Sequence, residues 1–185
     1  MERRSFLCSA VLATTSLVST RLFAATDLTA RGRHIQAGGD RYGNPVRLNG
    51  ITPTDTKVGS SDSGGNLYLF EHRNMPRGGP PRHYHLAQDE WFYVVAGEFV
   101  FEVADERFRL QQGDTIFLPR LVPHAWASLD TAGGTILGCV TPAGTFEEFF
   151  REVGRLTEVP APAEAERLFA YHGMKIVGPP LPLDQ

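Results

Sequence analysis

Three histidines and one glutamate have the residue types and spacing of a metal site. His83 and His85 are separated by one residue, and Glu90 follows after four others. Alternate side chains of a strand share one face, with Cα atoms roughly 7 Å apart, so both imidazoles can reach one ion. His124, much further along the chain, supplies a third imidazole. The set predicts one divalent-metal site, open to water, substrate or dioxygen, and it suits Fe, Mn, Ni, Cu, Co or Zn.

The other histidines and the cysteine of the central region have less specific surroundings. His34 lies in a polar stretch and is expected on the surface. His72 precedes a Gly/Pro-rich segment, and we expect a structural role for it, with pocket lining as the alternative. His172 ends an expected helix, where a cation favours the helix dipole and predicts a capping role. Cys139 lies in an apolar, strand-like run and is expected to be a buried core thiol.

Short strands with frequent turns are expected to position these side chains. Strand-like runs occur around His83 and over residues 67–72, 90–95, 99–103, 107–110, 115–118, 124–129 and 135–140. Turn residues separate the runs, which is typical of an all-β sandwich or barrel. Residues 54–65 are polar, and we expect irregular loops over 60–65 and 75–81.

Helical patterns appear only toward the C-terminus. Thr145 and Glu148 form an expected capping box for a helix over residues 146–153. A second helix is expected over residues 163–172, with Gly173 as its C-cap. The tail from residue 178 is expected to be extended.

Five aromatic side chains lie on or near the expected strands: Tyr84, Phe92, Phe101, Phe117 and Trp126. Large aromatic side chains of this kind are usually buried, so we expect them in the core. For those on the metal-facing side of a strand, lining of an apolar pocket is the alternative.

Composition restricts the class of protein. The chain has 185 residues, which is a one-domain length, and 42% of them are hydrophobic. Its formal net charge is -3, and no run of Lys or Arg forms a basic patch. Both features argue against a nucleic-acid binder.

The N-terminus predicts an export signal over residues 1–25. A positive start is followed by an apolar stretch over 5–18 and by small residues ending at Ala25. The apolar stretch is too short to span a bilayer comfortably, so we expect cleavage and no stable membrane anchor. Residues 3–7, Arg-Arg-Ser-Phe-Leu, resemble the twin-arginine signature. This predicts a periplasmic or secreted protein.

The spacing of the first three ligands resembles the first motif of the cupin family, G-x5-H-x-H-x(3,4)-E-x6-G. His83, His85, Glu90 and Gly97 all fit it. The leading glycine lies one place late, because Gly78 leaves four intervening residues instead of five.

The region around the fourth ligand resembles the second cupin motif, G-x5-P-x-G-x2-H-x3-N. Gly113, Pro119 and His124 fit it. Leu121 replaces the middle glycine and Ser128 the final asparagine, at positions that serve backbone geometry in the family. The resemblance is strong over residues 66–145.

The resemblance implies a double-stranded β-helix, or jelly-roll barrel, with His83, His85, Glu90 and His124 as metal ligands. Asp89 is a competing carboxylate, since the motif allows three or four spacers. The aromatic and apolar run over residues 91–97 matches the run after the glutamate in the family and favours Glu90.

Within the family, residues 80–85, 89–94 and 172–180 resemble the small proteins similar to quercetin 2,3-dioxygenase. This implies a metal-dependent dioxygenase that uses O2 to open a flavonol-like or other aromatic or enol ring. Glu90 would then be the catalytic base as well as a ligand. Two alternatives stay open: a non-catalytic cupin that binds a small ligand or a metal, and a metal-dependent isomerase or decarboxylase.

The resemblance also implies the organisation of the chain and its partners. We expect a signal peptide over 1–25, strands and loops over 26–65, the cupin barrel core over 66–145, and short helices with an extended tail over 146–185. The partners would be a small-molecule substrate or ligand, O2 for a dioxygenase, and a second copy of the chain in a homodimer.

Overall fold

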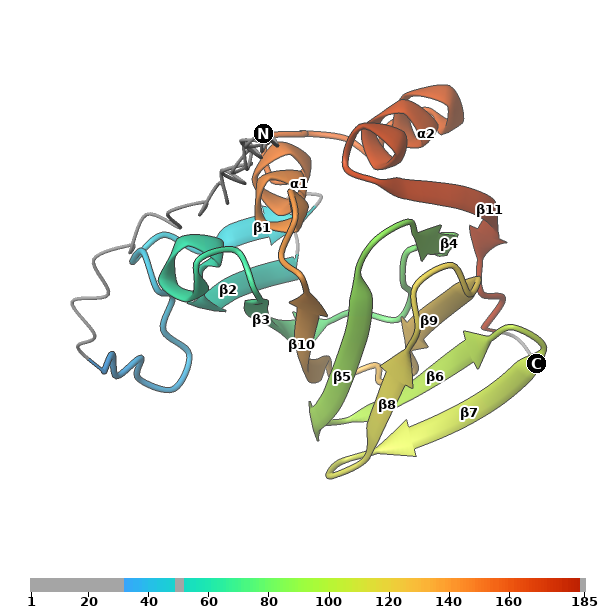
Figure 1. Cartoon of the computed structure of the whole chain (residues 1–185). Coiled ribbons are helices and arrows are strands. Elements are labelled where there is room, and N and C mark those ends of the chain that lie inside the picture. Colours follow the sequence, from blue (N-terminus) through green and yellow to red (C-terminus); the bar gives the residue numbers. More distant parts are fainter. Residues whose placement is uncertain (1–31, 49–51, 184–185) are drawn as a thin grey trace, which may run out of the picture. The chain divides into compact units, whose positions relative to one another are not determined.

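Antiparallel strands are the main secondary structure of residues 32–48 and 52–183, which the computed structural model describes (Figure 1). The predicted signal over 1–25 lies outside the described residues. The strands are β1 (Val46–Leu48), β2 (Thr52–Val58), β3 (Tyr68–Met75), β4 (Pro81–His85), β5 (Asp89–Ala96), β6 (Glu98–Val103), β7 (Glu106–Gln111), β8 (Thr115–Leu118), β9 (His124–Ser128), β10 (Gly134–Thr141) and β11 (Met174–Pro180). The helices are η1, a 3-10 helix (Ser60–Ser63), α1 (Phe146–Val153) and α2 (Pro162–Tyr171).

The strands form two sheets. One has the order β1-β2-β3-β10-β5-β8, and the other has the order β11-β4-β9-β6-β7. Neighbouring strands far apart in sequence, such as β3 with β10 and β4 with β11, are antiparallel. This arrangement confirms the predicted all-β jelly-roll barrel with two short helices.

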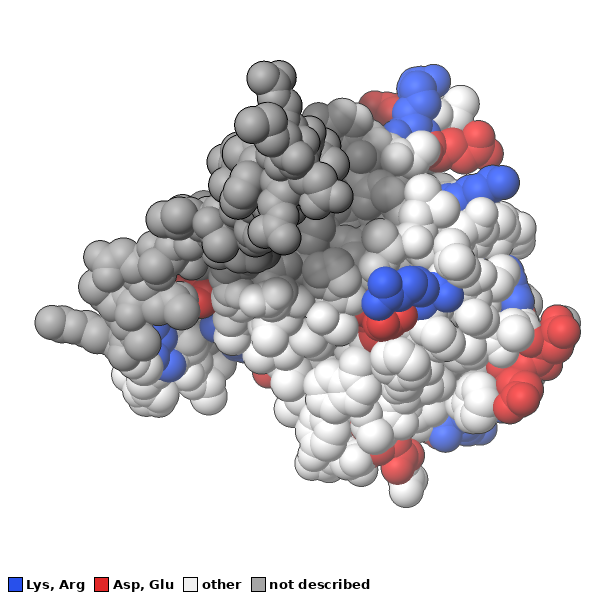
Figure 2. Space-filling model, in the orientation of Figure 1, with Lys and Arg blue, Asp and Glu red and all other residues white. Residues whose placement is uncertain are grey.

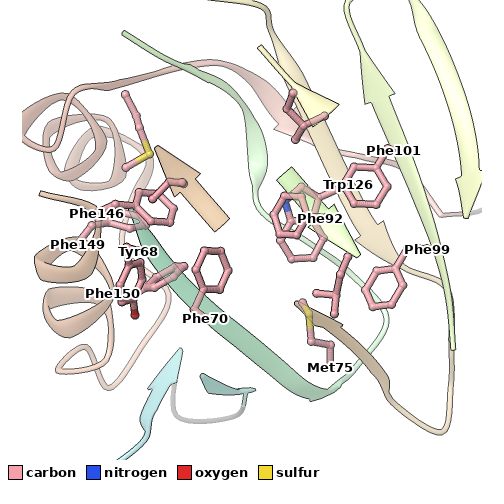
Figure 3. Close-up of a cluster of buried hydrophobic side chains, with 14 of the residues drawn as sticks. Tyr68, Phe70, Met75, Phe92, Phe99, Phe101, Trp126, Phe146, Phe149 and Phe150 are labelled. Atoms are coloured by element: carbon pink, nitrogen blue, oxygen red, sulfur yellow. The ribbon is translucent and has the colours of Figure 1, made fainter. Parts of the chain in front are cut away.

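The core lies between the sheets because the inward positions of most strands are apolar. Phe70 on β3, Phe92 on β5 and Phe101 on β6 are fully buried, and the Trp126 ring on β9 is buried with them (Figure 3). On β10, Gly138 faces this cluster, and a Cβ there would lie 2.3 Å from the Phe70 ring. A glycine at this position therefore allows the rings of two neighbouring strands to meet.

Helix α1 closes one end of the core. Phe146, Phe149 and Phe150 are buried on its inner side and contact Tyr68 and Phe70 (Figure 3). Residues three and four apart share a helix face, which explains how one short helix supplies three aromatic rings. None of the helices in the described residues is both long and apolar enough to cross a membrane.

The C-terminal segment covers the outer side of the second sheet. All five residues of β9 are buried, whereas a strand with one face in solvent would alternate between buried and exposed residues. Ala125 and Ala127 lie in a small apolar cluster with Val100 and Leu181. The expected extended tail is therefore a strand, β11, followed by residues that pack on the barrel.

The expected loop over residues 60–65 is wrong in part, because Ser60–Ser63 is a 3-10 helix. The polar residues before it belong to strand β2, Thr52–Val58. The strand is polar, but partners on β3 satisfy its side chains. Asp55 is fully buried and forms an ion pair with Arg73. Thr54 Oγ1 lies 2.8 Å from Nδ1 of His72.

Three local expectations are also wrong. Helix α1 begins where predicted, but the Thr145 side chain makes no capping hydrogen bond, so the capping box is not formed. Phe117 is 57% exposed, because it lies on the outward side of the edge strand β8. Cys139 is only partly buried, since alternation along β10 places it on the outward side.

Candidate metal centre

The four predicted ligands come from both sheets. His83 and His85 are the inward-facing residues at the end of β4, and both are buried. His124 begins the neighbouring strand β9 and pairs with His83. Glu90, near the start of β5, faces them from the other sheet. The turn between β4 and β5 thus returns the carboxylate to the pair of imidazoles, as the sequence predicts.

The ligand atoms of these residues converge on one point. One nitrogen of each imidazole and one carboxylate oxygen all lie within 4.8 Å of one another. Oε2 of Glu90 is 3.4 Å from Nε2 of His124 and 3.7 Å from Nε2 of His85. All four residues are buried, with at most 4% of any of them exposed.

The outer nitrogen of each imidazole faces an oxygen acceptor. Nδ1 of His83 lies 2.8 Å from the Pro81 carbonyl, and Nδ1 of His124 lies 3.0 Å from the Val122 carbonyl. Nδ1 of His85 lies 3.3 Å from Oε1 of Gln88. An oxygen of this kind can only accept, so each Nδ1 carries the proton and each Nε2 presents a lone pair.

Burial favours the neutral form of two of these imidazoles, those of His83 and His85. Burial lowers the pKa of His83 well below its usual value, and His124 and His85 lower it further. Burial also lowers the pKa of His85. Neutral imidazole is the form that binds a metal ion.

The inner atoms of the cluster have no hydrogen-bond partner among the described residues. Nε2 of His85, Nε2 of His124 and Oε2 of Glu90 are all buried and unpaired. Leaving such atoms unpaired is costly, and lone pairs and a carboxylate that face one another repel. A divalent cation would satisfy all of them at once, so the residues present fit a bound metal ion.

Asp89 is excluded as a ligand by its position. It is only partly buried, and its carboxylate binds Arg120, with Oδ2 2.6 Å from the guanidinium and Oδ1 2.9 Å from the backbone N–H. These contacts lower the Asp89 pKa to about 2. The choice of Glu90 over Asp89 in the sequence therefore agrees with the structure.

Two aromatic rings of the C-terminal helices cover the cluster. The Phe146 ring centroid lies 5.2 Å from that of His85, and the Phe169 ring centroid lies 5.3 Å from that of His83. A surface pocket of about 600 Å³ lies between α1 and α2 and is lined by none of the four ligands. Phe146 and Phe169 are not among the site residues predicted from the sequence, although the aromatic spacing in the expected helices is a signal for a buried face.

The remaining histidines lie outside the cluster. His72 is buried, bonds Thr54 and stacks on Trp126, which agrees with the structural role expected for it. His34 is exposed, as expected. His172 is at the C-cap of α2, but it is buried and its Nδ1 donates to the Thr145 carbonyl at 3.0 Å, so it also joins α2 to the start of α1.

Comparison with known proteins assigns the central part of the chain to a known domain. Residues 71–137 match the family model described as a cupin domain. The chain contains a cupin domain. The matched residues include all four candidate ligands, and the match confirms the resemblance seen in the sequence.

One of two similar solved structures, KdgF, agrees with the fold of the cupin domain. KdgF from Halomonas sp. superposes with a TM-score of 0.51 at 18% identity, over 60% of this chain and 94% of that one. An RmlC-like cupin from Shewanella frigidimarina superposes with a TM-score of 0.49 at 21% identity, over 60% of this chain and 93% of that one. The likeness to KdgF concerns the fold.

Among curated proteins, an uncharacterized protein of Methanocaldococcus jannaschii is 29% identical over 66 residues. The alignment covers 36% of this chain and 53% of that protein. This cupin chain thus spans about half the length of the curated relative that it matches.

Proposed function

We propose that this cupin is a metal-dependent dioxygenase that acts on a flavonol-like or other aromatic or enol small molecule. One observation carries the proposal: three imidazoles and one carboxylate converge on a buried point, where the inner atoms of His85, His124 and Glu90 lack other partners. The aromatic rings beside the histidines support a substrate of aromatic character.

Each residue would have a defined role. His83, His85 and His124 would hold the ion, and a bound transition metal would supply Lewis acidity and a site for dioxygen. Glu90 would accept the proton of the substrate hydroxyl at Oε2, because a carboxylate that also faces the cluster can act as a general base. The surrounding phenylalanine rings would exclude water from the bound substrate.

Metal content tests the first part of the proposal. Elemental analysis of the purified full chain should find about one transition-metal ion per chain, because one cluster of four ligands holds one ion. The double variant His83→Ala with His85→Ala should lose it, whereas His34→Ala, which changes an exposed histidine, should keep it. Full metal content in the double variant would contradict the assignment.

Oxygen consumption tests the second part. The metal-loaded protein should consume O2 when quercetin is added, and Glu90→Gln should slow consumption by about 10²- to 10⁴-fold, the usual contribution of a general base. If the loaded protein consumes no oxygen with any of several flavonols and polyphenols, the dioxygenase proposal is wrong.

A non-catalytic, ligand-binding or metal-binding cupin is the second candidate, and the closed site favours it. Phe146 and Phe169 pack directly on two ligand rings, and the four ligands are buried. A metal-loaded protein that binds small aromatic molecules without converting them would support this candidate. Conversion without oxygen consumption would instead indicate an isomerase or decarboxylase.

We also propose that the chain is exported to the periplasm or secreted by the twin-arginine route. The support is the sequence of residues 3–7. Replacing Arg3 and Arg4 by lysine should retain the protein in the cytoplasm, as measured by cell fractionation. Unchanged export of this variant would contradict the route.

A further inference from the structure

One of the three imidazoles is held differently from the other two. His83 and His124 each donate to the backbone carbonyl two residues earlier, at Pro81 and Val122. Each of these contacts joins residues only two apart, so the local backbone of the strand is enough to form it. His85 instead donates to a side chain, that of Gln88 in the turn between β4 and β5.

Gln88 has no freedom to turn away from His85. The residue is buried, with 4% of its surface exposed. Its Nε2 donates to the Ala143 carbonyl at 3.0 Å. Because that carbonyl can only accept, the amide orientation is fixed and Oε1 must face His85. One side chain thus connects a candidate ligand to the segment between β10 and α1.

The segment at the other end of this connection is built around Gln88. Gly144 has φ of 53°, and a Cβ there would lie 2.6 Å from Nε2 of Gln88. Two residues later, Phe146 begins α1 and places its ring against His85. The start of α1 is therefore linked to His85 in two ways. The Phe146 ring contacts His85 directly, and the Ala143 carbonyl is joined to His85 through the Gln88 amide.

We infer that Gln88 is a positioning residue, which fixes the His85 ring for metal binding and joins it to the start of α1. The inference rests on the metal site of the proposed function. Oε1 keeps the proton of His85 on Nδ1 and leaves the lone pair of Nε2 directed at the cluster. Partners of this kind change metal affinity by about 10- to 100-fold when removed. Packing of α1 on the barrel should therefore strengthen metal binding, and metal binding should stabilise the packed helix.

Affinity for Co²⁺ tests the role of Gln88 in the full chain, by competition with a chelator and by the visible absorption of the bound ion. Gln88→Leu removes both hydrogen bonds and should weaken Co²⁺ binding about 10- to 100-fold and change the absorption. Gln88→Glu keeps an acceptor for His85 but loses the donor to the Ala143 carbonyl, so it should lose less affinity than Gln88→Leu. Gln112→Leu, at an exposed glutamine, is the matched control and should equal wild type.

A second variant displaces the Gln88 side chain without replacing that residue. Gly144→Ala should displace the amide and weaken Co²⁺ binding, and adding Gln88→Leu should weaken it no further. Gly64→Ala imposes a similar backbone strain, with φ of 63° and no atom within 4 Å of the new Cβ, and should leave affinity unchanged.

The outcomes separate this inference from the proposed function. A wild-type chain that binds no Co²⁺ would overturn the metal site itself. A wild-type chain that binds Co²⁺, with affinity and spectrum unchanged in Gln88→Leu and in Gly144→Ala, would overturn the positioning role alone. Equal losses in Gln88→Leu and Gln88→Glu would also overturn it, because the acceptor would then be irrelevant.

Discussion

Asp89 and Glu90 are neighbours in the sequence with opposite environments in the structure. Strand alternation points Glu90 into the barrel and Asp89 outward to Arg120. Glu90→Gln should therefore weaken metal binding strongly, since it removes the only anionic ligand of the cluster. Asp89→Asn should leave metal content unchanged and only weaken the contact with Arg120. Elemental analysis of the two variants after identical purification checks this, and metal loss in Asp89→Asn would contradict it.

His72 should make stability depend on pH. Burial lowers its pKa to about 3, so the folded state keeps it neutral while the unfolded chain binds a proton below about pH 6.5. The stability from this residue is complete above pH 6.5 and is lost as the pH falls toward 3. Between pH 6 and pH 4 the loss should be about 2.5 kcal/mol.

Urea unfolding of the metal-free protein measures this effect. His72→Gln should unfold with a smaller pH dependence over that range, because the amide does not titrate. His34→Gln, at an exposed histidine, should keep the wild-type dependence. Equal pH dependence in wild type and His72→Gln would show that His72 is not the group responsible.

At the scale of elements, Leu121 occupies a backbone conformation suited to glycine. It has φ of 65° and lies at the place where the cupin motif has its middle glycine. Its side chain is 59% exposed, so replacing it loses little burial. Left-handed backbone costs a non-glycine residue about 1–3 kcal/mol, and the greater freedom of glycine in the unfolded chain offsets part of the gain.

Leu121→Gly should therefore raise the free energy of unfolding by about 0.5–1 kcal/mol, as thermal or urea unfolding would show. Leu86→Gly is the control, because Leu86 is also exposed but is not in the left-handed region. That substitution should be destabilising. A loss of stability in Leu121→Gly would show that the leucine side chain makes a contribution larger than the strain.

The elements that the sequence predicts best are those with clear alternation. β8 and α1 begin and end at the expected residues, and the other strands from β5 to β10 differ by one or two. β2 escapes prediction because its inward side chains are polar and are satisfied by β3, a contact that no local pattern reveals. His83, His85 and Glu90 are predictable from their local spacing, and His124 from the second motif. Gln88 and Phe169, by contrast, are placed at the site by contacts that no local pattern reveals.

At the scale of the molecule, we expect the proposed homodimer to use the outer face of β5 and β8. Trp91 pairs with Phe117 across these strands, and Tyr93 is exposed beside them. Figure 2 shows this face largely free of charged side chains, with a blue and red pair above it and red atoms at its lower end. Apolar faces of this kind often mark sites of association between proteins.

Light scattering coupled to size-exclusion chromatography tests the dimer. The wild-type chain should have twice the mass of one copy, and Phe117→Asp should have the mass of a single copy. Phe108→Asp changes an exposed phenylalanine on β7, in the other sheet, and should stay dimeric. A wild-type monomer, or a dimer that persists in Phe117→Asp, would contradict the choice of this face.

The pairing of the last strand has a consequence for the newly made chain. β4, which carries His83 and His85, lies between β9 and β11, so both of its neighbours are synthesised after it. A nascent chain that has not yet released residues 174–180 from the ribosome leaves one edge of β4 without hydrogen bonds. The ligand pair is then held on one side only, and ion loading should follow translation. Chains that lack residues 174–180 should therefore bind the ion more weakly than complete ones, although they carry all four ligands.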